Sequence, residues 1–547
     1  MKMDAHRLVA PLKVGDLKPL VPSDGNSTLY DIEVEFGFDN PAILRCFSSA
    51  ITLGADLYCL EEIPLEGILL EDNEELCELG FWSDDKVYRC SFWVRERDII
   101  NIDEIDGDLC VGYAIFKKDG RSNNAATWYV FEAVFKSIHS NLKCISFLGK
   151  YKFRIGSRNL TIEGVLYCQQ NGLNKACSQV ALRSLLSRVI EGDDISYRCI
   201  NELAFGKKRL NGRSNIGLAP IHIEKVVTNI GLGYYGATFS ALKGGRVIVA
   251  DDLPYLRVLY SGIEAGLGSF LGFGPNGIES KENDRHVIPL FGHTFDCDNW
   301  VAGAQEKYFC RDKSKDINKL QSDAWAGAFL GHDDNFGPNL LIPRHYIRRE
   351  STFYAGVILP PKSKTPSIVA EERGRILLDS IVQKHFQIID NEWVQRIIEY
   401  YKLRTARVVL RTVRALGSEY FEKLCNHVDV QGRKECNSAL CKIVDIIPED
   451  VWVIEISLYP IYGIRDKIGE IVLDASINLL PLEKRAGVSK IGVVDNIWDC
   501  FKFVRVPGAY FVKRGNDKHG YPKFEVVNSS ILSHSTCFSN FTFLPIS

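Results

Sequence analysis

One stretch of the chain excludes both a helix interior and a central strand: Pro360-Pro-Lys-Ser-Lys-Thr-Pro366. Proline lacks the backbone N–H that helices and sheet ladders use, and its ring clashes with the preceding helical turn. We therefore predict a domain boundary here. The chain has 547 residues, and because domains run to roughly 100–200 residues, we expect three or four of them.

The distribution of apolar residues predicts a different kind of structure in each part of the chain. Residues 151–360 mix helix and strand patterns, 367–450 keep helical spacing, and 451–547 return to strand-like runs. The predicted fold class is therefore α+β, in a multidomain chain. Residues 1–150 are expected to form a β-rich domain from four segments of strand length: Leu29–Phe36, Lys86–Val94, Leu109–Lys117 and Trp128–Phe135.

The charge balance argues against a protein dedicated to nucleic acid. Sixty-six Lys and Arg against 69 Asp and Glu give a net charge of −3, so no global positive field steers the chain to phosphates. No run of roughly 18 apolar residues is present, and we expect no membrane-spanning helix. The first residues, Met1-Lys-Met-Asp-Ala-His, lead into a mixed stretch instead of an apolar signal core, which predicts a cytoplasmic protein.

The 16 cysteines include no Cys-x-x-Cys pair. In a reducing compartment most of them should be buried thiols, and we expect neither a metal nor a cofactor. The nearest approach to a metal cluster lacks the tight spacing of a zinc knuckle, and we predict no zinc there. Its members are Cys425, His427, Cys436 and Cys441.

The most informative segment is centred on Cys177. Apolar residues after it recur at helical spacing, and Asn171-Gly172 before it favours a turn, so we predict a core-packed helix that begins at or near Cys177. A cysteine in that position lies at the positive end of the helix dipole, which favours a nucleophilic thiolate. A glutamine a few residues upstream can join the Cys177 backbone N–H in donating to an oxyanion.

A nucleophilic cysteine needs a histidine base and a third group that orients the histidine. His286 heads an apolar strand-like run, Arg285-His-Val-Ile-Pro-Leu-Phe-Gly-His, whose last residue, His293, is the second choice for the base. A second apolar run, Ala328-Phe-Leu-Gly-His-Asp-Asp, ends in carboxylates. If the two strands pair, Asp333 or Asp334 can reach the imidazole of His286.

These residues, in this order, resemble the papain-like cysteine peptidases. The order is similar to that of the bacterial branch typified by bacteriocin-leader-processing peptidase domains. It runs from Gln to a Cys that opens a helix, then to a His that heads a strand, then to an Asp that closes the next strand. The segment Leu259–Gly272 resembles the helix, glycine and strand that precede the histidine strand in that branch. The likeness covers residues 160–345 and implies a central domain in which the helix that carries the cysteine packs on an antiparallel sheet.

The resemblance implies a role for each residue. Cys177 is the nucleophile, His286 the base and Asp333 the orienting residue, with Asp334 as the alternative. Gln170 is the oxyanion donor, and Gln169 competes for that role. The expected function is that of a cytosolic cysteine peptidase, isopeptidase or amidase, acting on a peptide or protein substrate, whose flanking domains can hold a protein partner.

The rival hypothesis is a papain-like shell without turnover that contacts protein or nucleic acid through an arginine-rich helix. Four arginines at 3-4-3 spacing support it, although the same segment is β-branched enough to form a strand. They are Arg404, Arg407, Arg411 and Arg414.

Two shorter motifs have weaker claims. Gly231-Leu-Gly-Tyr-Tyr-Gly236 matches the dinucleotide-binding spacing, but a glycine-rich loop is the favoured interpretation. His332 beside Asp333 is similar to the metal-binding pair of the helical phosphohydrolases, but its flanks predict a strand instead of a helix.

Overall fold

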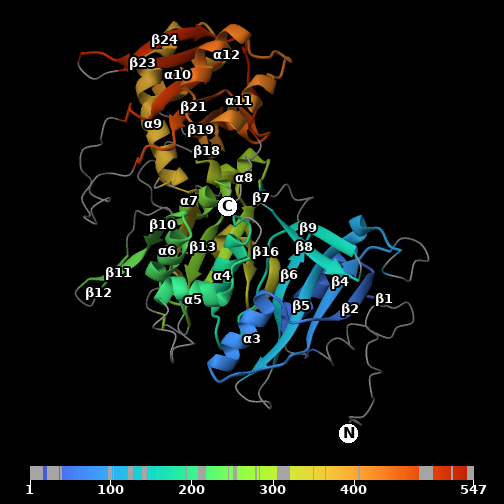
Figure 1. Ribbon diagram of the computed structural model, residues 1–547. Helices are drawn as coiled ribbons and strands as arrows, with labels where there is room; N and C mark the ends of the chain where they lie inside the picture. The colour runs from blue at the N-terminus through green and yellow to red at the C-terminus, as the bar shows by residue number, and fades with distance from the viewer. Residues whose placement is uncertain are drawn as a thin grey trace.

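Antiparallel sheets with helices packed against them make up the described part of the chain (Figure 1). Helices and sheets are mixed, as the predicted α+β class requires. None of the helices in the described ranges is long and apolar enough to cross a membrane. The computed structural model describes residues 17–20, 36, 40–95, 102, 104–120, 127–137, 145–146, 148–156, 158–190, 194–206, 217–243, 246–249, 255–265, 267–277, 280–281, 284–304, 321–348, 350–361, 363, 365–403, 407–479, 497–518 and 522–538.

The N-terminal sheet has the strand order β1-β2-β4-β5-β3, with β6 beside β5. Three of the four predicted strand segments are confirmed as β4, β5 and β6, whereas Leu29–Phe36 lies outside the described residues except for Phe36. Two helices that the apolar pattern did not predict accompany the sheet, α2 (Pro41–Thr52) and α3 (Ile68–Glu78). The strands are β1 (Leu17–Pro19), β2 (Leu57–Ile63), β3 (Trp82–Ser83), β4 (Val87–Trp93), β5 (Cys110–Gly120) and β6 (Thr127–Phe135).

The central sheet has the order β10-β17-β13-β14-β15-β16, with β7 beside β14. Its strands are β7 (Ile145–Ser146), β10 (Gly233–Thr238), β13 (Ser269–Phe273), β14 (His286–His293), β15 (Ala328–Asp333), β16 (Gly337–Pro343) and β17 (Thr352–Leu359). Two hairpins stand apart from it, β8 (Gly149–Ile155) with β9 (Arg158–Gly164) and β11 (Ser240–Lys243) with β12 (Arg246–Val249).

Helices pack against the central sheet and fix which residues meet at its edges. Helix α4 (Cys177–Leu186) packs on β14, and α7 (Tyr255–Glu264) packs on β13, β14 and β17. The predicted pairing of the histidine strand with the carboxylate strand is confirmed, because β14 lies beside β15. The remaining helices of this part are α5 (Tyr197–Phe205), α6 (Pro220–Asn229) and α8 (Asn299–Ala304).

The C-terminal sheet lies at the far end of the molecule from the N-terminal strands (Figure 1). Its order is β18-β19-β21-β22-β23-β24. Its strands are β18 (Val408–Leu416), β19 (Asp450–Leu458), β21 (Gly469–Asp474), β22 (Phe501–Val506), β23 (Ala509–Asn516) and β24 (Pro522–Asn528), and β20 (Asp466–Lys467) pairs with β25 (Ser535–Thr536). The helices are α9 (Ser367–Lys384), α10 (Glu392–Lys402), α11 (Gly417–Asn426), α12 (Asn437–Ile443) and α13 (Tyr459–Tyr462).

The prediction of an arginine-rich helix is wrong. Strand β18 carries Arg411 and Arg414 in the middle of the region that we expected to be helical, and pairs with β19 along its whole length. Arg411 is fully buried between Glu264 and Glu455, and Arg414 forms an ion pair with Asp450. Buried β-branched neighbours favour the strand, and the guanidinium groups are held inside the molecule. Arg404 lies outside the described residues, and Arg407 precedes the strand.

The glycine motif at Gly231 does not form a dinucleotide-binding turn. Gly233 and Gly236 lie in β10, in register with Leu359 and Gly356 of β17. A phosphate-binding fingerprint needs a turn that opens a helix. Here the second and third glycines lie inside an extended strand.

Candidate active site

Cys177 is the first residue of α4, as its sequence context predicts. Ala176 precedes the helix in extended conformation, and its backbone N–H donates to the side chain of Gln179, which ties down the first turn. Cys177 is half-buried, whereas the nine residues that follow it in α4 are buried. The core therefore fixes the helix while Cys177 stays partly exposed.

His286 begins β14 and is half-buried. Its ring packs edge-on against Phe273 of β13, with centroids 5.4 Å apart. The Cys177 thiol lies close enough to the His286 imidazole to contribute to the raised pKa of that imidazole. The packing of α4 on β14 brings these two residues together from positions 109 apart in the sequence (286 − 177).

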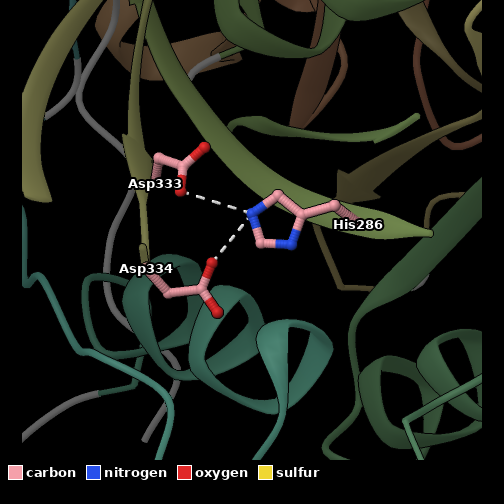
Figure 2. Close-up of side chains that lie close together, drawn as sticks. All are labelled: His286, Asp333 and Asp334. Carbon is pink, nitrogen blue, oxygen red and sulfur yellow. Dashed lines mark hydrogen bonds and ion pairs between the residues drawn. The ribbon is translucent and has the colours of Figure 1, made fainter. Parts of the chain in front are cut away.

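Two carboxylates face the same ring nitrogen of His286 (Figure 2). Nε2 lies 3.4 Å from Asp333 Oδ1 and 2.9 Å from Asp334 Oδ1. Asp333 makes the hydrogen bond. Asp334 lies closer, but neither of its carboxylate oxygens has hydrogen-bond geometry toward a donor among the described residues, so its contact with His286 is an ion pair.

Successive residues of a strand point to opposite faces, so only one of these aspartates could face His286 if β15 contained both. β15 ends at Asp333, and Asp334 already lies in the turn, so both carboxylates face the ring. Asp333 also makes a local turn contact, because its Oδ1 accepts the Asn335 backbone N–H at 2.9 Å. Asp333 is thus held from two sides.

The electrostatics of the cluster favour a protonated imidazole. Burial lowers the pKa of His286, but contacts with Asp333, Asp334 and Cys177 outweigh burial and raise that pKa to about 12. Burial raises the pKa of Asp333, and its hydrogen bond to His286 more than compensates, so the net pKa is lowered. Burial dominates at Asp334 and raises its pKa. Asp333 is therefore the carboxylate better suited to pair with an imidazolium.

The two candidate glutamines have different surroundings. Gln170 donates its amide to Asn335 Oδ1 at 3.0 Å, and Asn335 Nδ2 lies 3.4 Å from His286 Nε2. Gln169 exchanges hydrogen bonds with Asn40 and accepts the Val130 backbone N–H, so it is engaged in the N-terminal sheet. Gln170 is the glutamine that borders the cluster. Asn335 was missed by the sequence analysis, and its place directly after two aspartates is the signal that marks it.

The loop between Gln170 and Cys177 is anchored in the N-terminal part of the chain. Lys175 Nζ lies 3.2 Å from Asp72 Oδ1 and 3.0 Å from the Tyr129 hydroxyl, and the Lys175 and Asp72 side chains are almost fully buried. Asn174 donates to both Asp72 and Glu75 of α3. These bonds fix the backbone immediately before the thiol.

Helix α2 holds the carboxylate turn in a similar way. Arg45 donates to the backbone carbonyls of Pro338 and Asn339 at 3.2 and 3.1 Å. Gly337 has a φ of +112°, and a Cβ there would meet the Arg45 Cβ at 2.5 Å, so glycine is required. The N-terminal part therefore touches both the loop before Cys177 and the turn after Asp334.

The other histidines of this region are occupied elsewhere. His293 is buried at the opposite end of β14, where its Nε2 lies 2.8 Å from Glu264. His332 is buried between the Val165 carbonyl and the Asn339 backbone N–H, and burial lowers its pKa to about 3. His332 and Asp333 thus do not form the metal-binding pair of a phosphohydrolase.

The sequence and the structure were compared with known proteins. No known protein family matches the sequence, and no curated protein matches it. Among solved structures, the chain is similar to the peptidase domain of Streptococcus ComA, a bi-functional ABC transporter involved in a quorum sensing pathway. The identity is 11% and the TM-score 0.21, and the match covers 36% of this chain and 98% of that domain.

Proposed function

We propose that the protein is a cysteine peptidase-type hydrolase that cleaves a peptide or amide bond. Cys177 is the nucleophile, His286 the acid and base, and Asp333 the residue that orients the imidazole. One observation carries the proposal: the His286 imidazole is hydrogen-bonded to a carboxylate at the end of the neighbouring strand, and a thiol at the start of a helix contributes to its raised pKa.

The charges of the cluster suit nucleophilic attack. An imidazolium beside Cys177 stabilises the thiolate, and the positive end of the α4 dipole acts in the same direction. The sulfur forms a bond to the carbonyl carbon, and the C=O electron pair moves to oxygen. The Gln170 amide and the Cys177 backbone N–H are the donors suited to stabilise that oxyanion.

The remaining steps use His286 twice. The imidazolium gives its proton to the leaving amine as the C–N bond breaks, which leaves a thioester on Cys177. The neutral imidazole then takes a proton from water, whose oxygen adds to the thioester carbon. Collapse expels the thiolate, releases the carboxylic acid and restores the ion pair with His286. Asp333 stabilises the imidazolium at both ends of the cycle.

In this proposal residues 151–360 form a papain-like peptidase domain in a cytoplasmic protein, where the thiol stays reduced. The substrate is a peptide or protein, and the flanking regions bind it or a protein partner. The competing hypothesis of a non-catalytic scaffold depended on an arginine-rich helix. Arg411 and Arg414, which were to supply its contacts, are buried ion-pair partners in β18.

An activated ester tests the proposal without knowledge of the natural substrate. p-Nitrophenyl acetate should acetylate Cys177, seen by peptide mass spectrometry, and release p-nitrophenol in a burst. Cys177→Ser should abolish the burst, and His286→Ala should slow it by about 10²–10⁴-fold. Acetylation spread over the exposed thiols Cys77, Cys199, Cys297 and Cys441, unchanged in His286→Ala, would reject a catalytic Cys177.

A further inference from the structure

The cluster at His286 contains one more carboxylate than the proposed hydrolysis needs. Asp333 already accepts from His286 and from the Asn335 backbone N–H. Asp334 is only 4% exposed, and neither of its carboxylate oxygens is hydrogen-bonded within the described part of the chain. Its side chain is in an ion pair with His286 at 2.9 Å, and a buried carboxylate held by a charge contact alone can exchange that contact for a metal cation.

The spacing of the three side chains matches a small metal ion. Nε2 lies 2.9 and 3.4 Å from the two carboxylates, and all three donor atoms lie within 4.8 Å of one another. Zinc binds imidazole nitrogen and carboxylate oxygen at about 2.0–2.2 Å, so neighbouring ligand atoms of a tetrahedral zinc are roughly 3.3–3.6 Å apart. A zinc ion at the centre of the cluster therefore requires the distance between Nε2 and Asp334 to lengthen by a few tenths of an ångström and the carboxylate oxygens, now within 4.8 Å of each other, to lie about 3.3–3.6 Å apart.

The donor set also suits zinc chemically. One neutral imidazole and two carboxylates balance the charge of a divalent ion, and three protein ligands leave the fourth tetrahedral position for water. The imidazole must lose its Nε2 proton to bind, so a metal ion and that proton compete for one atom.

We propose that His286, Asp333 and Asp334 form a zinc site and that zinc bound there holds the protein inactive. Zinc on Nε2 removes the imidazolium that pairs with the Cys177 thiolate and blocks proton transfer by His286. This inhibitory consequence depends on the proposed hydrolase function, whereas the binding of zinc itself depends only on the geometry of the three ligands. Asp334, which the proposed hydrolysis does not use, is then a zinc ligand.

Zinc titration of three proteins tests the site. Wild-type protein stripped with EDTA, Asp334→Asn and Cys177→Ser are each titrated with Zn²⁺ alone against a chromophoric chelator. Wild type and Cys177→Ser should take up the same high-affinity equivalent of zinc. Asp334→Asn should bind that equivalent at least about 10–100-fold more weakly, since even the loss of an outer partner costs that much. Equal zinc affinity in wild type and Asp334→Asn would overturn the proposal.

The variants also separate this inference from the proposed function. Asp334→Asn nearly preserves the side-chain volume, and circular dichroism checks its fold; if the fold is lost, Asp333→Asn replaces it in the same titration. Metal-free p-nitrophenyl acetate bursts test the hydrolase independently. A Cys177 burst without zinc binding at this site rejects only the zinc proposal. Zinc binding that depends on Asp334, without a burst, rejects only the hydrolase and the inhibition that depends on it.

Discussion

Lys175 Nζ lies 3.2 Å from Asp72 Oδ1, and the two side chains are 0% and 1% exposed. Asp72 also accepts from Lys117 Nζ at 2.7 Å, so one buried carboxylate serves two buried ammonium groups. Burial raises the pKa of Asp72, but the two lysines outweigh burial and lower it. This contact joins α3 to the loop that ends at Cys177.

Removal of Asp72 should therefore be strongly destabilising. Asp72→Ala leaves Lys117 and Lys175 buried with an unbalanced charge, and we expect a loss of about 3–5 kcal/mol in the free energy of unfolding, measured in urea. Glu74→Ala is the matched control, since Glu74 is exposed on the same helix and should change stability by less than about 0.5 kcal/mol. Equal effects of the two variants would mean that the buried contact does not anchor the loop.

The neighbouring glutamines should differ in what they affect. Gln170→Ala should lower the rate of Cys177 acetylation by about 10²–10³-fold, the usual cost of one oxyanion donor. Gln169→Ala should leave that rate nearly unchanged and lower the unfolding free energy instead, because it breaks bonds to Asn40 and Val130. Rates measured by the p-nitrophenol burst decide the assignment, and the reverse result transfers the role to Gln169.

Asp333 should matter more to the metal-free reaction than Asp334. Asp333→Asn removes the carboxylate hydrogen-bonded to Nε2 and should slow acetylation by about 10²–10⁴-fold in the presence of EDTA. Asp334→Asn should retain most of the rate under the same conditions. If Asp334→Asn is the slower variant, Asp334 orients the imidazole; if neither substitution has an effect, the turn after β15 has no part in catalysis.

Acid should destabilise the C-terminal sheet through Glu470. Burial raises the pKa of this fully buried carboxyl, but Arg505 and Lys467 outweigh burial and lower it to about 2. Because the unfolded pKa is about 4.3, the unfolded state binds the proton more readily. The stabilising contribution of Glu470 is therefore complete above pH 4.3 and is lost as the pH falls toward about 2.

Urea unfolding at several pH values measures this loss. In wild type the unfolding free energy should fall with decreasing pH below about 4.3, and Glu470→Gln should show a shallower slope over the same interval. Between pH 5 and 7 the two proteins should have parallel profiles. Identical slopes below pH 4 would show that Glu470 is not ionised through this network.

The sequence predicted the elements that local patterns determine. Helical spacing placed the start of α4 at Cys177, and apolar runs headed by His286 and ended by Asp333 became the paired strands β14 and β15. The conformation of the β18 segment was harder to predict, because its arginines also fit one face of a helix. Their partners Glu264, Glu455 and Asp450 are distant in sequence, so the burial that favours the strand could not be deduced from the segment itself.

The surroundings of the candidate site could not be predicted for the same reason. Lys175 contacts Asp72, which lies 103 residues away in the sequence, and Gln170 contacts Asn335, which lies 165 residues away. The contact of Asp334 with His286 depends on where β15 ends, because one residue more of strand would have turned that carboxylate to the other face. Strand ends are decided by tertiary pairing, which a local pattern does not contain.

The central claim is that Cys177 is an activated thiolate held by His286. The most direct measurement is the rate of alkylation by iodoacetamide at each cysteine, followed by peptide mass spectrometry at neutral pH with EDTA present. We predict that half-buried Cys177 reacts faster than the exposed Cys77, Cys199, Cys297 and Cys441, and that His286→Ala removes this difference. Alkylation of Cys177 no faster than that of the exposed cysteines, with no change in His286→Ala, would contradict the account.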